Sequence, residues 1–229
     1  MIEPAEITIV HSSDLHIDGK DIHDFHPLCK VTAAARRLEA DVLLLAGDIF
    51  DHNRVPLAVI DQAARVLDDA GIPIVILPGN HDPLSADSVY RRGGLADVPK
   101  VHVLGVSSEE VFLLPDRDLE IWGRPHPDYL DYSPLAAPRP RTTRWQIAVA
   151  HGHWVQDHRD RHRSWLIHND EIAETGADYV ALGHWPSAMA AGDGRVPAYY
   201  SGSPDLAQTV NVVRLTERGV EVTRAPLTD

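Results

Sequence analysis

Histidine and carboxylate side chains in this sequence are concentrated in short polar motifs. The chain contains 14 histidines but one cysteine, Cys29, which excludes a cysteine-rich zinc site and an iron–sulfur cluster. The motifs are Asp14–His16, Gly47–Asp51, Gly79–Asp82, His151–His153 and Gly183–His184. Carboxylates, imidazoles and one amide suit manganese, iron or zinc, and a carboxylate can bridge two such ions about 3.5 to 4 Å apart. The motifs therefore predict a two-metal centre of the kind that hydrolases use.

Each motif directly follows a segment that is expected to form a β-strand. In the first half of the chain, the order of the elements is strand, helix, strand, helix, strand. The strands are expected at Ile7 to His11, Val42 to Ala46 and Ile72 to Leu77, and the helices after Pro27 and from Pro56 to Ala70. This order predicts a parallel sheet with right-handed connections. Because ligands of open α/β sheets bind at the carboxyl ends of the strands, the motifs are expected to converge there.

After about Asp97 the pattern changes to shorter strand-like pieces. They are Val101 to Leu104, Val111 to Leu114, Leu119 to Trp122, Trp145 to Ala150, Tyr179 to Leu182, Ala198 to Tyr200, Val210 to Leu215 and Val220 to Arg224. A short helix is expected near Asn169 to Thr175, and the proline-rich segment from Asp131 to Arg144 is expected to be a surface loop. Together the pieces predict a second, mixed sheet packed on the first, with helices outside.

The composition indicates one α/β domain over residues 1–229. The chain is 44% apolar and has a formal net charge of -13, which disfavours non-specific coating of nucleic acid. The N-terminus lacks the basic and apolar regions of a secretion signal, and the apolar stretches are too short to span a bilayer. A single cysteine fits a reducing compartment. We therefore expect a cytoplasmic protein with no membrane partner.

The ordered motifs resemble the signature of the calcineurin-like metallophosphoesterases. The resembling segments are Ser13–His16, Ala46–Asp51, Pro78–Asp82, Ala150–Gly152 and Leu182–His184. Within that superfamily, Tyr179–His184 and Tyr200–Pro204 resemble the SbcD-type DNA repair exonucleases. The resemblance covers nearly the whole chain. It implies an α/β fold in which two mixed β-sheets between helices form a four-layer sandwich.

The resemblance also implies a role for each matching residue. One metal ion would be bound by Asp14, His16 and Asp48, and a second by Asn80, His151 and His184, with Asp48 bridging the two. His81 would be the acid that assists the leaving oxygen, while a hydroxide held by the metals attacks phosphorus in line. The cofactors implied are two divalent ions, with manganese expected first and iron or zinc as alternatives.

The sequence departs from the family pattern in two respects. The family's last motif is Gly-His-x-His, and its second His belongs to the first metal ion, but here Pro186 stands at that position. The first site is therefore expected to bind its ion weakly, to recruit His153 or water, or to stay empty. The second departure is length, because the chain stops where SbcD-type nucleases continue into a DNA-capping region and a segment that docks on their ATPase partner. We assume neither a capping domain nor an ATPase partner.

Residues near the motifs are expected to have supporting roles. Asp51 and Asp82 should orient imidazoles or loops, and Trp185 should pack in the core in preference to stacking on a base. His11, His52 and His126 receive no role. Six arginines flank the strand before His151 and would either attract phosphorylated substrates or form a solvated loop. They are Arg139, Arg141, Arg144, Arg159, Arg161 and Arg163.

The sequence thus predicts a metal-dependent phosphoesterase that hydrolyses phosphodiester bonds in a nuclease-like manner, with nucleic acid or a nucleotide as substrate. One alternative is a phosphatase or nucleotide phosphodiesterase that acts on small molecules. The other is a non-catalytic binding protein with a degraded metal site, which Pro186 favours and the retention of the other motif residues disfavours. The exact substrate, the native metal and the oligomeric state are left open.

Overall fold

A six-stranded sheet organises the first half of the molecule. A computed structural model describes residues 6–21, 25–156 and 162–228 of the chain. The order of the first sheet is β14-β13-β1-β2-β3-β4. Its strands are β1 (Ile7–Ser12), β2 (Val42–Ala46), β3 (Ile74–Leu77), β4 (Val101–Val103), β13 (Thr209–Thr216) and β14 (Gly219–Pro226). Strands β1 to β4 are parallel, whereas β13 is antiparallel to β1 and β14 is antiparallel to β13.

A second six-stranded sheet has the order β11-β12-β10-β7-β6-β5. Its strands are β5 (Val111–Leu114), β6 (Leu119–Trp122), β7 (Trp145–His151), β10 (Tyr179–Gly183), β11 (Met189–Ala191) and β12 (Ala198–Tyr200). The inner strands β6, β7, β10 and β12 are parallel, and the edge strands β5 and β11 are antiparallel to their neighbours. A separate parallel pair consists of β8 (His153–Trp154) and β9 (Leu166–Ile167).

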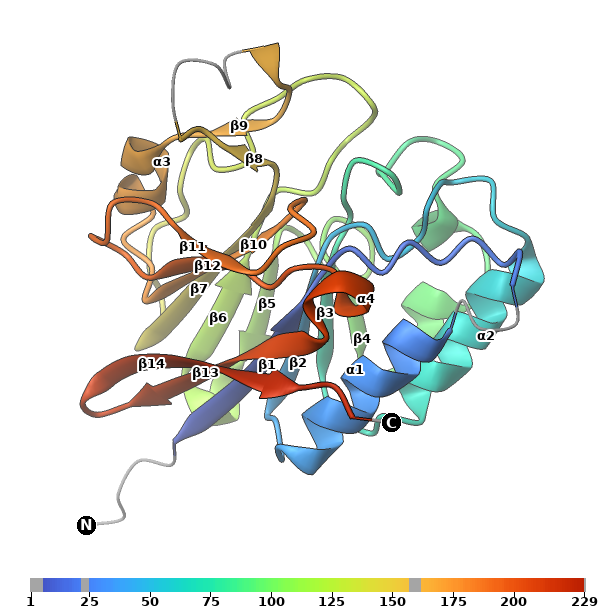
Figure 1. The fold of residues 1–229 in the computed structure, drawn as a ribbon, viewed down its shortest axis with the longest axis horizontal. Coiled ribbons are helices and arrows are strands. Elements are labelled where there is room, and N and C mark those ends of the chain that lie inside the picture. Colours follow the sequence, from blue (N-terminus) through green and yellow to red (C-terminus); the bar gives the residue numbers. More distant parts are fainter. Residues whose placement is uncertain (1–5, 22–24, 157–161, 229) are drawn as a thin grey trace.

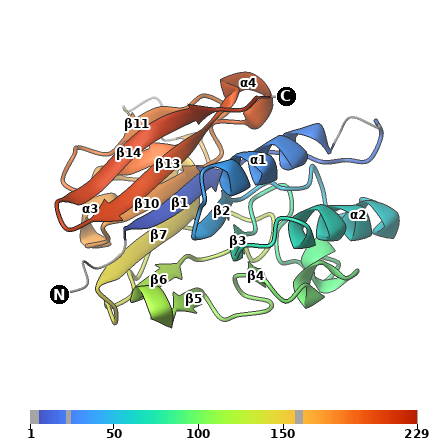
Figure 2. The ribbon, with the colours of Figure 1, turned by 90° about the horizontal axis from the view of Figure 1, so that it is seen from below.

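Two helices, α1 (His26–Arg37) and α2 (Leu57–Asp68), pack on the first sheet (Figures 1 and 2). Pro27 lies in the first turn of α1, where its fixed φ suits a helix and its missing N–H costs nothing. The chain turns away from α2 at Gly71, whose φ of 72° is accessible to glycine without strain. The shorter helices are α3 (Asn169–Glu174), on the second sheet, and α4 (Pro204–Ala207), and single 3-10 turns occur at Val89–Arg91, Leu95–Asp97 and Pro115–Arg117.

The side chains of β2 show why the sheets stack in layers. Successive residues of a strand point to opposite faces. Leu43 and Leu45 accordingly join the apolar cluster under α1 and α2, whereas Val42 and Leu44 join the cluster between the two sheets. A third cluster lies on the other face of the second sheet and includes Ile172 of α3. The three apolar layers confirm the predicted four-layer arrangement of two mixed sheets with helices outside.

The predicted composition of the second sheet is partly wrong. The early strands and helices form as expected, with β3 starting at Ile74 and α2 ending at Asp68. However, β4, β13 and β14 belong to the first sheet. β4 continues its parallel order beyond β3, and β13 pairs with the free edge of β1 from Ile7↔Leu215 to His11↔Asn211. A strand's own sequence does not specify its partner, because both sheets offer an apolar face and an open edge.

The predicted loop from Asp131 to Arg144 contains no strand or helix. Across the described segments of the chain, helices are too short and too polar to cross a bilayer.

Candidate metal centre

The loops that follow β1 and β2 are joined by backbone hydrogen bonds. The amide nitrogens of Leu15 and His16 donate to the carbonyl oxygen of Asp48 at 2.9 and 3.1 Å. Asp14, His16 and Asp48 all have positive φ angles between 51° and 57°, as side chains seldom do outside functional sites. The backbone therefore holds these three side chains in a strained but defined arrangement at the carboxyl edge of the sheet.

The first group of closely spaced ligand atoms consists of Asp14, Asp48 and His151, which we call the inner group. All three residues are buried. Nε2 of His151 lies 3.1 Å from Oδ2 of Asp48, and Nδ1 of His151 donates to the carbonyl oxygen of Ala46 at 2.8 Å. Because Nδ1 is used in this way, Nε2 is the nitrogen that a metal ion would bind.

The ionisation of the inner group reflects two buried carboxylates close to one imidazole. Burial raises the pKa of Asp14 to about 6 against the opposing effect of His151. Burial alone would also raise the pKa of Asp48, but the charge of His151 lowers it below its usual range. Burial alone would lower the pKa of His151, yet Asp48 raises it to about 9. The site therefore favours a positive charge, carried by a proton or a metal ion, between these side chains.

Asn80 and His184 extend the inner group. Oδ1 of Asn80 lies 3.0 Å from Nε2 of His151 and 3.0 Å from Nδ1 of His184. The backbone N–H of His184 donates to the carboxylate of Asp14 at 3.1 Å. Burial, followed by the nearby His151, lowers the pKa of His184 to about 3, so its imidazole is neutral and has a lone pair for a metal ion.

Two glycines permit this close packing. A Cβ atom on Gly47, whose φ is 92°, would lie 2.1 Å from Nδ1 of His151. A Cβ atom on Gly79 would lie 2.2 Å from Oδ1 of Asp48. Any larger residue at either position would displace a proposed ligand, so both glycines are required by the geometry of the centre.

The second group of ligand atoms, the outer group, consists of His16, Asp48 and His81. The His16 and His81 side chains are 35% and 42% exposed, and their rings meet edge to face at 4.6 Å. Asp51 lies against both rings, with Oδ1 3.2 Å from Nδ1 of His16 and 3.4 Å from Nδ1 of His81. Asp51 therefore orients two imidazoles, as the sequence predicted.

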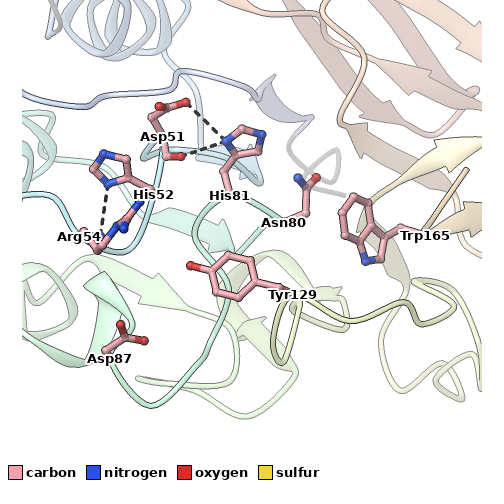
Figure 3. Close-up of a pocket in the computed structure, with 8 residues that line it drawn as sticks. All are labelled: Asp51, His52, Arg54, Asn80, His81, Asp87, Tyr129 and Trp165. Carbon is pink, nitrogen blue, oxygen red and sulfur yellow. Dashed lines mark hydrogen bonds and ion pairs between the residues drawn. The ribbon is translucent and has the colours of Figure 1, made fainter.

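The His81 side chain is fixed at one nitrogen and accessible at the other. Nδ1 donates to the carbonyl oxygen of Asp51 at 2.9 Å, and the backbone N–H of His81 donates to Oδ1 of Asp48 at 2.9 Å. The ring lines an open pocket (Figure 3).

Asp82 is a structural residue beneath the centre. Its fully buried carboxylate accepts hydrogen bonds from the backbone N–H groups of Ile49, Phe50 and Gly79 and from the Tyr90 hydroxyl. These bonds tie the loop after β2 to the loop after β3 and confirm the predicted role of Asp82 in orienting loops.

The donor set fits divalent metal ions. Seven predicted site residues lie in one connected network of contacts: Asp14, His16, Asp48, Asn80, His81, His151 and His184. The network combines carboxylate oxygens, imidazole nitrogens and an amide oxygen, which borderline to hard divalent cations prefer. Buried carboxylates on this scale also require a compensating positive charge.

Pro186 is exposed, and its carbonyl oxygen accepts a hydrogen bond from the backbone N–H of Ser203 at 3.0 Å. The ring of His153 lies 6.0 Å from that of His184, edge to face, and 5.2 Å from that of Trp185, in a tilted arrangement. Neither group of ligand atoms found among the described residues includes His153. Trp185 packs against the outer apolar cluster of the second sheet, in agreement with the expected packing role.

Of the six arginines expected either to attract substrate or to form a solvated loop, Arg139, Arg141 and Arg144 lie far from the centre. Arg141 pairs with Asp178 at 2.6 Å, and Arg144 lies over the ring of Trp145. Trp145 is the first residue of β7 and His151 the last, so these side chains lie about 20 Å from the centre by strand length. Arg139 interacts with Glu120 in the same region, Arg163 is exposed, and Arg159 and Arg161 lie outside the described residues.

Several residues beside the centre received no role from the sequence. Arg54, Tyr129 and Trp165 line the pocket that His81 and Asn80 border (Figure 3). His126 is buried and its Nε2 donates to the carbonyl oxygen of His151 at 2.8 Å. His126 lies four residues beyond the end of β6, so the strand-end pattern does not identify it.

Comparisons with known proteins agree with this geometry. The model of the calcineurin-like phosphoesterase family matches residues 7–188. The DNA double-strand break repair protein Mre11 of Saccharolobus solfataricus is 26% identical over 87% of this chain and 55% of that protein. Mre11 of Haloferax volcanii is 28% identical over 96% of this chain and 52% of that protein. The chain thus spans about half the length of these curated relatives.

Two further similarities have a lower coverage of the chain or a lower sequence identity. UDP-2,3-diacylglucosamine hydrolase of Stenotrophomonas maltophilia is 31% identical over 47% of this chain and 45% of that protein. The crystal structure of TT1561 of Thermus thermophilus superimposes with a TM-score of 0.66 over 98% of this chain and 100% of that one at 13% identity, which supports the fold alone. The family match covers most of the chain and agrees with the predicted class of enzyme: the chain belongs to the calcineurin-like phosphoesterase family.

Proposed function

We propose that the chain forms one catalytic domain that hydrolyses phosphodiester bonds at a centre of two divalent metal ions. The observation that carries this proposal is the connected network of carboxylate, imidazole and amide ligands. Its members come from five strand ends of two sheets, and Oδ2 of Asp48 is 3.1 Å from His151 and 4.0 Å from His16. Asp48 contacts a histidine of the inner group and a histidine of the outer group, so its carboxylate could bridge two ions.

In the proposed centre, each ion would be bound by some side chains that are buried and others that are partly exposed. Asp14, His16 and Asp48 would hold the first ion, and Asp48, Asn80, His151 and His184 would hold the second. When bound, the ions polarise the phosphoryl oxygens and promote ionisation of a water molecule near neutral pH. Manganese is the expected ion, because the ligands are oxygen and nitrogen without thiolate.

In this proposal the chain's own residues orient the metal ligands and supply a proton to the leaving group. His81 donates a proton from Nε2 to the leaving oxygen while Asp51 holds Nδ1. Ala46, through its carbonyl oxygen, keeps Nε2 of His151 directed at the centre. The apolar layers beneath the edge keep bulk water from the buried carboxylates, which strengthens every charge interaction at the site.

The two DNA repair proteins that match most of the chain support a phosphodiester as the substrate. They also support nucleic acid or a nucleotide as the molecule that contains this bond. A second candidate is hydrolysis of a small-molecule phosphate ester, which the similarity to UDP-2,3-diacylglucosamine hydrolase favours. A cytoplasmic location fits the free and exposed Cys29.

The test begins with metal content and ends with turnover. Purified protein should contain up to two divalent ions per chain, and addition of manganese should raise hydrolysis of bis-p-nitrophenyl phosphate above that of p-nitrophenyl phosphate. Preference for the monoester would favour the second candidate. A protein that binds manganese without hydrolysing either ester would support the non-catalytic alternative and overturn the proposal.

A further inference from the structure

An open pocket of about 560 Å³ adjoins the outer group of the centre. Its volume is in the usual range for pockets that bind small ligands, about 300 to 1,000 Å³. Asn80 and His81 form the side nearest the proposed metal ions, while Tyr129 and Trp165 present their rings to the same space (Figure 3). An ester whose phosphorus lies at the centre would therefore extend one of its organic groups into this pocket.

The described residues that line the pocket include two aromatic rings and no aliphatic side chain. The remaining lining groups are polar or charged, among them His52 and Asp87. An acyl chain would leave these polar groups without hydrogen bonds, at a cost in free energy. A flat group with hydrogen-bonding edges suits both kinds of lining, because its faces contact rings and its edges meet polar atoms.

Tyr129 is available for such a contact. Its side chain is 56% exposed, so its ring is accessible to a ligand in the pocket that it lines. Its hydroxyl accepts a hydrogen bond from Nδ2 of Asn53 at 3.3 Å, so the ring is anchored at one end.

Trp165 is held in place by the loop that carries Tyr129. Its indole Nε1 donates to the carbonyl oxygen of Leu130 at 3.0 Å, and its backbone N–H donates to Oδ1 of Asp131 at 2.6 Å. Trp165 adopts a φ of 56°, a strained value for an aromatic residue, and its ring lies 6.0 Å from that of His184. The two aromatic side chains thus belong to one preorganised wall that reaches the proposed metal ligands.

Arg54 supplies a positive charge to the opposite part of the pocket (Figure 3). Within the part of the chain that the structure describes, no carboxylate forms an ion pair with its guanidinium. Asp51 and Asp87 line the same pocket, so Arg54 does not make it positive overall, but its guanidinium can donate hydrogen bonds to a phosphate oxygen at short range.

We propose that this pocket binds the nucleoside portion of the substrate, with an unstacked base against Tyr129 and Trp165. The proposal rests on the proposed phosphodiesterase function and specifies its substrate class. Stacking of a base on an aromatic ring tolerates any base, so the pocket recognises a nucleotide without reading its sequence. Tyr129 and Trp165 are substrate-positioning residues in this arrangement.

The test compares two esters that share the p-nitrophenol leaving group: thymidine 5′-(p-nitrophenyl phosphate) and methyl p-nitrophenyl phosphate. With added manganese, wild-type protein should hydrolyse both and prefer the nucleoside ester. Tyr129→Ala should lower kcat/KM for the nucleoside ester by about 5- to 100-fold, mainly through KM, as expected for the loss of one stacked base. The methyl ester should change less than about twofold in the same variant, since it has no base to stack.

Two variants control for structure. Tyr129→Phe keeps the ring and should retain the preference for the nucleoside ester, whereas a hydroxyl role would remove it. Leu130→Ala truncates an accessible neighbour whose side chain does not line the pocket and should leave both rates unchanged. Equal loss on both esters in Tyr129→Ala, or no loss on either, would overturn the inference about the pocket. Absence of wild-type turnover of both esters would instead overturn the proposed function.

A third substrate distinguishes the source of the nucleotide. The substrate is a short single-stranded oligonucleotide. If Tyr129→Ala lowers its cleavage as much as that of the nucleoside ester, the pocket binds nucleotides at strand ends. Cleavage of the nucleoside ester alone would assign it to free nucleotides. A Tyr129→Ala variant that cleaved the nucleoside ester as well as wild type would overturn both assignments.

Discussion

The inner and outer groups of the centre share Asp48 but differ in what surrounds their imidazoles. His151 of the inner group is fully buried and held at both ring nitrogens, whereas His16 of the outer group is 35% exposed and held by the partly exposed Asp51. A buried ligand in a fixed rotamer needs no reorganisation to bind a metal ion. An exposed one must give up side-chain freedom and hydration when the ion arrives.

This difference predicts unequal retention of the two ions. His151, a proposed ligand of the second ion, is buried and fixed by the backbone of Ala46, so the second ion should dissociate slowly. The ion bound through His16 should exchange more readily, and Pro186 adds to this because the family pattern has an imidazole there. The centre would then combine one resident ion with one that exchanges with solution.

The largest effect should come from Asp48→Asn, because Asp48 belongs to both groups. Asparagine keeps an oxygen for the backbone N–H of His81 but loses the negative charge that would bridge the two proposed ions. Each ion is worth several kcal/mol to the transition state, so hydrolysis should fall by more than about 10⁴-fold. The measurement is turnover together with metal content, and Asp68→Asn, on the exposed face of α2, is the matched control. Near wild-type turnover in Asp48→Asn would disprove the two-metal centre.

His81→Ala separates the two functions of the outer group. Loss of a general acid should lower the rate by about 10²- to 10⁴-fold while metal content stays close to wild type. The comparison requires turnover at saturating manganese and metal analysis of the same sample. A variant that lost an ion but kept its rate would identify His81 as a ligand, which its place in the outer group also permits geometrically.

Asp51→Asn weakens the support of the outer group without removing a proposed ligand. Asp51 orients His16 and His81, and loss of such an orienting carboxylate typically costs about 10- to 100-fold in metal affinity or activity. The concentration of manganese that gives half-maximal activity should therefore rise. The second ion, whose proposed ligands include His151 and His184, should remain after dialysis, and its loss in Asp51→Asn would contradict the predicted difference between the two ions.

The smallest effect is expected from Pro186→His. The substitution keeps the carbonyl oxygen that Ser203 uses, and the exposed position accepts a larger side chain. If the new ring turns toward the centre, the labile ion should resist mild chelation by about tenfold more than in wild type. Pro186→Ala controls for the loss of the proline itself. Two equally tight ions in wild type, without a gain in Pro186→His, would show that another group already completes the first site.

Strand-end motifs and periodicity were sufficient to predict the central strands, the main helices and the seven residues of the network. The prediction is possible because a buried strand followed by Gly and a polar residue is a local sequence pattern, and such a pattern is typical of the carboxyl edge of a sheet. His126 lies four residues beyond the end of β6 and has Pro125 and Pro127 as immediate neighbours, so this pattern assigns it no role.

The amino-acid sequence by itself determined which polar side chains are candidate ligands and which elements carry them, and its resemblance to the family marks Pro186 as a departure. The tertiary structure decided which sheet β4, β13 and β14 joined, that Asp51 contacts both His16 and His81, and that the loop of Tyr129 meets Trp165 beside the centre. The reason is that periodicity and burial are encoded within a few residues. Contacts such as that between His151 and Asn80, 71 positions apart, form only when the two sheets pack and bring their edge loops together.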